Sequence, residues 1–284
     1  MSEPNETDEI NDDAVLVRRT GTVTTCTLNR PGTGNKLDAT LLDLLAERVR
    51  EARDAGTRVL VLRGAGDDFC LGRQGPRLDG PPTPSILNAE FARVQGVNEL
   101  VEDFPGLTVS VVHGRALGAG ASLAGRCDLV VAASTARLAF PEVPHGIAPT
   151  VVASYFVHRL NRTALLDLLL TGRVVDAVEA QRLGLVSRIV DEETLDGSVD
   201  ALAEELARLD PDIVRTIKSF IGVASTVPPR TAVRLGVAEL VNQMVDQAAT
   251  DQATTDQATT DQATTDQATT DQATTPDPSI GGSR

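Results

Sequence analysis

The spacing of apolar residues divides the N-terminal half of the chain into strands and helices. Residues 14–29 alternate between apolar and polar side chains around Gly21, which predicts a β-hairpin. Apolar residues three or four positions apart predict a helix over 38–55 with one buried stripe, and Asp38 stands at its start as the N-cap. Short runs rich in Val and Leu, typical of buried strands, occupy residues 58–63, 107–113, 129–131 and 185–190.

Helical spacing accounts for most of the rest of the chain. Asp176 is expected to cap a short helix that ends before Gly184. Further helices are predicted over residues 86–103, from Pro149 through Tyr155 and Leu160, and over 162–170, 192–208, 211–222 and 229–245. Strands that alternate with helices indicate an α/β fold with largely parallel pairing.

Composition narrows the choice of core and compartment. Aromatic residues make up only 2% of the 284 residues and Trp is absent, so the core must consist of Leu, Val and Ala. The three cysteines, Cys26, Cys70 and Cys127, are scattered and have no metal-binding spacing, which predicts reduced thiols. The chain has no apolar run near 18 residues and begins with a polar, acidic segment. We therefore expect a cytoplasmic protein without a membrane partner.

The charge of the chain is concentrated at its two ends. The net charge is −14, of which residues 1–13 carry −6 and residues 246–284 carry −6, so the body between them is close to neutral. A near-neutral body argues against a nucleic-acid partner, which would require a basic face. Residues 1–13 are expected to be disordered, and 246–284, with five copies of DQATT, to form a flexible low-complexity tail.

Two glycine-rich turns follow predicted strands, at residues 64–73 and 114–120. A strand that leads through such a turn into a helix leaves main-chain N–H groups without partners, and these groups can hold an oxygen on which negative charge develops. Glu142 follows the second turn and is flanked by Pro141 and, two residues on, Pro144. It is a candidate acid/base group for chemistry at this place.

Five segments in a characteristic order carry a resemblance to a known family. They read LNRPGTGNKLD at 28–38, GAGDDFCLG at 64–72, HGRALGAGASLAGRCDLVVA at 113–132, LAFPEV at 138–143 and LLTGRVVDAVEAQRLGLVSRIV at 169–190. Over residues 14–245 the chain resembles the crotonase (enoyl-CoA hydratase/isomerase) superfamily. The resemblance implies a ClpP/crotonase-like ββα superhelix over 14–190 and a C-terminal helical region over 191–245 that forms trimers or pairs of trimers.

The resemblance also implies an acyl-CoA substrate and roles for particular residues. The main-chain N–H groups of Arg73 and Ala119 would hold the thioester oxygen, and Glu142 would move the proton. The remaining substrate contacts implied are Lys36, Leu37, Gly72, Gln74 and Gly118. Neither a metal nor a separate cofactor is implied, because coenzyme A is part of the substrate.

Several departures from the family pattern leave the reaction open. Ser122 stands where hydratases of the family carry a second Glu, so double-bond isomerisation, C–C cleavage and hydration by Glu142 alone all stay possible. Cleavage in the related lyases uses a tyrosine from the C-terminal part, whereas the one Tyr here is Tyr155. Ser122 with His145 as its base would suit a CoA-thioester hydrolase. A non-catalytic acyl-CoA-binding protein is a further alternative.

Arg73 and Ala119 also differ from the residues that are usual at their positions. Arg73 is large and charged where the family mostly has a compact residue, and its side chain either reaches a carboxylate or phosphate of the ligand or points to solvent. Ala119 replaces a glycine, which is harmless only if its φ is negative.

Overall fold

The computed structural model describes residues 14–75, 78, 80–249 and 252. The predicted acidic N-terminus and nearly all of the DQATT tail lie outside these residues. The chain forms two compact units, Met1–Ile217 and Lys218–Arg284, and everything described below belongs to the first unless stated. None of the described helices has the length and apolar character needed to cross a membrane.

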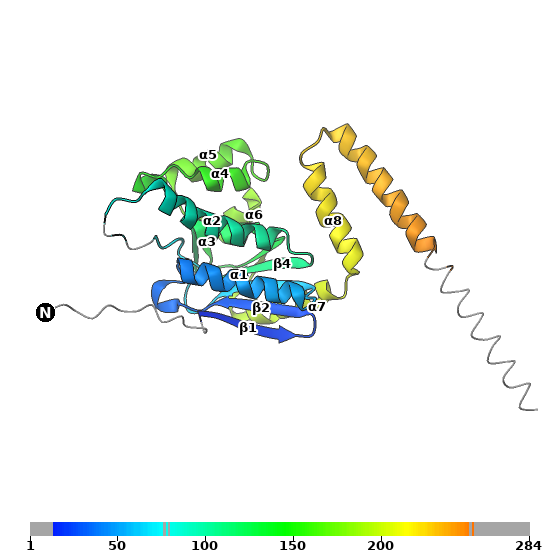
Figure 1. Ribbon diagram of the computed structural model, residues 1–284, viewed down its shortest axis with the longest axis horizontal. Coiled ribbons are helices and arrows are strands. Elements are labelled where there is room, and N and C mark those ends of the chain that lie inside the picture. The colour runs from blue at the N-terminus through cyan, green and yellow to red at the C-terminus, as the bar shows by residue number, and fades with distance from the viewer. Residues whose placement is uncertain (1–13, 76–77, 79, 250–251, 253–284) are drawn as a thin grey trace, which may run out of the picture. The chain divides into compact units, whose positions relative to one another are not determined.

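A six-stranded sheet forms the centre of the first unit (Figure 1). Its order is β1-β2-β3-β4-β6-β9; β1 runs antiparallel to β2, and every other neighbouring pair is parallel. The strands are β1 (Val15–Thr20), β2 (Val23–Leu28), β3 (Val59–Gly64), β4 (Leu107–Val112), β6 (Leu129–Ala133) and β9 (Arg188–Val190). The predicted hairpin and largely parallel α/β arrangement are confirmed.

A second sheet of three very short strands was not predicted. It consists of β5 (Arg115–Leu117), β7 (Arg137–Ala139) and β8 (Val175–Asp176), in the order β5-β7-β8. Strands of two or three residues are too short to show a period of two, so the sequence carries no signal for them. The sheet matters because it holds both the second glycine-rich turn and the segment that leads to Glu142.

Helices cover both faces of the larger sheet. Helix α1 (Ala39–Asp54) packs against β1 and β2, and α7 (Leu195–Ala207) packs against β2, β3 and β4. The other helices of the first unit are α2 (Pro84–Glu102), α3 (Ala119–Arg126), α4 (Thr150–Phe156), α5 (Arg162–Thr171) and α6 (Ala177–Leu183). Burial on both faces explains why β3 is a continuous apolar run, with Val59, Leu60, Val61 and Leu62 at most 2% exposed.

The two helix N-caps predicted from the sequence are confirmed. The side chain of Asp38 accepts a hydrogen bond from Leu41 N, and that of Asp176 accepts one from Glu179 N, as N-cap residues do.

The predicted boundaries are wrong where apolar residues continue beyond the helix or strand. Helix α4 ends at Phe156, before Leu160, α7 begins only at Leu195, after a 3-10 turn, and β9 begins only at Arg188. Leu160 and Leu185 are buried from loops.

The described part of the second unit is helical. Helix α8 (Pro211–Ala224) ends in it, and a further helix runs over residues 229–249. The ring of Phe220 lies close to Gly236, since a methyl group built on that glycine would come within 3.1 Å of the ring. The two predicted C-terminal helices therefore pack against each other.

Candidate active site

The first glycine-rich turn, residues 64–73, is held by buried polar side chains. Asn35 is fully buried, and its side-chain amide donates to the carbonyl oxygens of Ala65 (2.9 Å) and Asp68 (2.8 Å). The Asp68 carboxylate accepts from the main-chain N–H of Arg115 (2.9 Å) and from two nitrogens of its guanidinium (2.8 and 2.7 Å). These contacts join the turn to β5, and the Arg115 guanidinium holds the pKa of Asp68 below its usual range.

Arg73, at the end of this turn, presents its main-chain N–H away from the neighbouring segment. It pairs with Leu37 as an isolated parallel bridge: Leu37 N donates to Gly72 O and Gln74 N to Leu37 O, each at 2.9 Å. In such a bridge the N–H of the paired residue faces the opposite side. Among the described residues, no acceptor for the N–H of Arg73 is found.

The second glycine-rich turn brings the start of α3 to the same place. Gly72 has φ +99°, and a methyl group built on it would lie 3.1 Å from Leu117 O and 3.9 Å from Ala119 N. Ala119 is the first residue of α3, so its N–H has no partner within the helix. Its φ is not positive, since Asn35 is the one described non-glycine residue with positive φ. Alanine at this position is therefore unstrained.

Glycine at position 120 allows α3 to approach the first turn. A methyl group built there would lie 2.3 Å from Cys70 O and 2.8 Å from Cys70 Sγ, inside any tolerable contact distance. Cys70 itself is fully buried, and desolvation raises the pKa of its thiol to about 12. Cys70 packs as an apolar side chain, and the N–H groups of Arg73 and Ala119 lie on segments that are in contact.

The carboxyl group of Glu142 lies against this turn. A methyl group built on Gly118, whose φ is +52°, would come within 2.9 Å of Glu142 Oε1. The other carboxyl oxygen, Oε2, is buried without a hydrogen-bond partner. Desolvation by burial raises the pKa of Glu142, and its own main-chain N–H and the charge of His145 oppose this rise only in part. A partly desolvated carboxyl group against the Gly118 turn is suited to moving a proton.

Ser122 and His145 do not form a nucleophile–base pair in the structure. Ser122 is 2% exposed on the second turn of α3, and its Oγ is buried without a partner. Nδ1 of His145 donates to Pro141 O at 2.7 Å, and no hydrogen bond joins its ring to Ser122 Oγ. The arrangement of a serine hydrolase is thus not formed between the two residues.

The remaining predicted substrate contacts lie near Arg73 in different environments. Leu37 is 1% exposed and pairs with Arg73 through the main chain, and Gln74 follows Arg73 directly. Lys36, next to Leu37, is exposed. Asn35, Asp68 and Arg115 were not singled out from the sequence, although the Asn35 side chain organises the turn. A buried Asn after two glycines was the available signal, because Asn tolerates positive φ and can hydrogen-bond the main chain.

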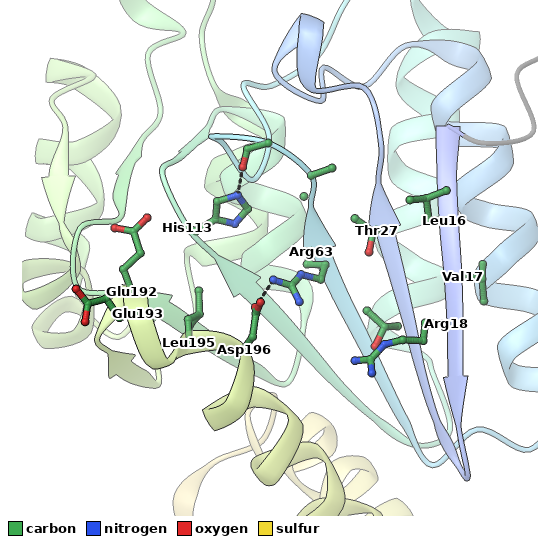
Figure 2. A pocket seen from close by; sticks show the side chains of 14 residues that line it. Leu16, Val17, Arg18, Thr27, Arg63, His113, Glu192, Glu193, Leu195 and Asp196 are labelled. Atoms are coloured by element: carbon green, nitrogen blue, oxygen red, sulfur yellow. Dashed lines mark hydrogen bonds and ion pairs between the residues drawn. The ribbon is translucent and has the colours of Figure 1, made fainter.

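A separate cavity of about 590 Å³ lies elsewhere in the first unit, lined by β1, β2, β3 and the start of α7. Figure 2 shows its polar and charged side chains, among which Arg63 pairs with Asp196 at 2.5 Å and His113 Nε2 donates to Gly66 O at 2.8 Å. It contains none of Arg73, Ala119 or Glu142. The cluster around Glu142, in contrast, joins a carboxyl group to N–H donors for which the described part of the chain shows no acceptor. Within the described residues, no three His, Cys, Asp or Glu side chains gather as metal ligands.

Comparison with known proteins identifies the family. The family model for enoyl-CoA hydratase/isomerase matches residues 18–258. This chain belongs to that family. Among its relatives is the 2,3-dehydroadipyl-CoA hydratase of Escherichia coli, which is 30% identical over 232 residues, covering 79% of this chain and 86% of the relative.

Solved structures of the family share the fold. An enoyl-CoA hydratase of Mycobacterium smegmatis is 28% identical, with a TM-score of 0.77 over 82% of this chain and 91% of that one. A Thermobifida fusca protein solved in complex with acetoacetyl-CoA is 27% identical, with a TM-score of 0.72 over 83% of this chain and 96% of that one. The predicted crotonase fold is confirmed.

Proposed function

We propose that this member of the enoyl-CoA hydratase/isomerase family adds water to the double bond of a 2-enoyl-CoA. In this proposal the N–H groups of Arg73 and Ala119 bind the thioester oxygen, and Glu142 is the acid/base group. The observation that carries the proposal is the desolvated Glu142 carboxyl group, which lies against Gly118, the residue before Ala119. The relatives support the substrate class, since one is named as an enoyl-CoA hydratase and another binds acetoacetyl-CoA.

The chemistry follows from what two N–H donors and one carboxylate can do. Donors aimed at the thioester oxygen stabilise the enolate that forms when a nucleophile adds to the β-carbon. The Glu142 carboxylate takes a proton from water as the oxygen bonds to that carbon. The protonated Glu142 then delivers the proton to the α-carbon, the enolate collapses to the thioester, and the carboxylate is regenerated. One molecule of water is consumed and no further reactant is needed.

The same groups also support a double-bond shift, the second activity in the family description. Glu142 would remove a proton from the α-carbon of a 3-enoyl-CoA and return it to the γ-carbon, through a dienolate whose oxygen the same two N–H groups hold. Hydrolysis through Ser122 has less support, because Ser122 Oγ is buried and forms no hydrogen bond with His145 or any other described residue. Tyr155 lends no support to C–C cleavage, since it lies on α4 and not in the C-terminal part from which the lyases draw their tyrosine.

The test is hydration of crotonyl-CoA, followed by loss of the ultraviolet absorption of the conjugated thioester. Replacing Glu142→Gln removes the acid/base group at almost constant size and is expected to lower kcat about 10²–10⁴-fold. Glu47→Gln is the matched control, because Glu47 is exposed on α1. It should keep the wild-type rate. Ser122→Ala should lower the rate only modestly.

Three outcomes would contradict the proposal. Hydration or isomerisation that persists in Glu142→Gln would remove Glu142 from the mechanism. Release of free thiol that depends on Ser122 would indicate a thioester hydrolase. Tight binding of crotonyl-CoA and 3-enoyl-CoA without turnover would indicate a non-catalytic binding protein.

Three further expectations, on cofactor, assembly and location, belong to this proposal. We expect no cofactor beyond the coenzyme A of the substrate, a homotrimer or a pair of trimers, and a cytoplasmic location. Size-exclusion chromatography with light scattering tests the assembly.

A further inference from the structure

The side chain of Arg73 places a cation beside the proposed site, and no described acid pairs with it. Its Nη1 atom is buried and has no hydrogen-bond partner. The guanidinium carbon lies 4.9 Å from the centre of the Phe91 ring, on α2. A methyl group built on Gly75 would lie 3.3 Å from Nη1, so the guanidinium is folded back over its own segment. This arrangement differs from that of an arginine extended into solvent.

The acid beside the Phe91 ring is engaged elsewhere. Glu90, next to Phe91 and 7% exposed, approaches Nη1 of Arg93 at 3.4 Å. Arg93 also approaches Asp43 at 3.4 Å. No ion pair of Arg73 is found within the described part of the chain. The face of an aromatic ring offsets only a small part of the cost of burying an unpaired charged donor. Arg73 is half-buried, and its unsatisfied Nη1 donor requires a partner that a ligand in the neighbouring site can supply.

The position of Arg73 limits which part of the ligand its guanidinium can reach. In the proposed function its main-chain N–H holds the thioester oxygen, and its side chain leaves the same Cα. A guanidinium reaches about 6–7 Å from its Cα, a span of about five bonds. The phosphates of coenzyme A are separated from the thioester by the whole pantetheine arm, beyond this reach. An acyl chain of five or six carbons, in contrast, ends within it.

We propose that Arg73 binds a carboxylate at the far end of the acyl group, so that the preferred substrates are CoA thioesters of dicarboxylic acids. This inference rests on the proposed function, because it assumes that the thioester oxygen is bound at the Arg73 amide. A guanidinium pairs with a carboxylate through two parallel hydrogen bonds, which gives direction as well as strength. The residue that positions the carbonyl would thus also select the chain end.

The test compares binding of adipyl-CoA with hexanoyl-CoA by isothermal titration calorimetry. Both acyl groups have six carbons and differ at the end, which is a carboxylate or a methyl group. Neither has a double bond to hydrate or shift, so binding is measured without turnover. The wild type should bind adipyl-CoA about 10- to 100-fold more tightly, and the preference should shrink as salt is added. Arg73→Met should abolish the preference, and Arg73→Lys should keep part of it.

Arg93→Met is the matched control, because Arg93 lies on α2 close to Phe91 but has acidic partners. It should retain the preference. Equal binding of both thioesters by the wild type, or a preference that survives in Arg73→Met, would overturn the inference. If the protein hydrates enoyl-CoA but does not prefer adipyl-CoA, only the inference about Arg73 is wrong. If it prefers adipyl-CoA but hydrates no enoyl-CoA, only the proposed reaction is wrong. Failure of the wild type to bind either thioester contradicts both.

Discussion

Replacing Gly120→Ala tests whether the contact between α3 and the first glycine-rich turn matters for activity. The added methyl group would lie 2.3 Å from Cys70 O, whereas a carbon and a carbonyl oxygen normally stay about 3.3 Å apart. Either α3 or the turn must therefore move by about 1 Å. The closest atom belongs to the main chain, so a smaller side chain at Cys70 does not remove the clash.

The expected effects follow from that displacement. Overpacking of this kind costs about 1–3 kcal/mol of unfolding free energy, which for a unit of this size lowers the Tm by about 2–12 °C. The N–H of Ala119 moves relative to that of Arg73, so one donor to the thioester oxygen is lost. Loss of such a donor costs about 10²–10³ in kcat. The assay is kcat for crotonyl-CoA hydration at a temperature well below the Tm of the variant.

Two glycine variants serve as controls. Gly125→Ala overpacks the other end of α3, where the methyl group would lie 2.6 Å from the Phe156 ring, and should lose stability while keeping kcat. Gly96→Ala, on α2, meets nothing within 4 Å and should gain about 0.5–1 kcal/mol. The reasoning is refuted if Gly120→Ala is destabilised as expected but keeps its kcat, or if Gly125→Ala loses as much activity.

Two further predictions concern carboxyl groups. Asp68→Asn should lower the free energy of unfolding in urea by about 2 kcal/mol, because three bonds from Arg115 are weakened. Since Arg115 lowers the pKa of Asp68, this stabilisation is complete above the unfolded-state pKa of about 3.9 and is lost as pH falls through the lower folded-state value. The difference between wild type and variant should therefore vanish in strong acid. For Glu142, burial raises the pKa, so kcat/KM for hydration should increase with pH through a value above the ordinary pKa of about 4.3. An acid limb at or below that ordinary value would contradict a desolvated base.

The sequence by itself determined the local structure and the family. Alternation over residues 14–29, the apolar stripe of α1 and the caps Asp38 and Asp176 specify their elements through contacts within a few residues. The five motifs carried the family assignment and the choice of Glu142, Arg73 and Ala119 as candidates. These features could be predicted because each depends on neighbours in the chain.

The tertiary structure decided how segments far apart in sequence meet. The short strands β5, β7 and β8 exist only as partners of one another, so no local pattern marks them. Asn35 and Asp68 became organising residues only when the fold brought Ala65 and Arg115 within reach. The desolvation of Glu142 and the missing partner of Arg73 Nη1 likewise depend on what surrounds each group in space. The burial of a side chain and its hydrogen-bond partners depend on all of its neighbours in space. Most of those neighbours are brought together by long-range packing.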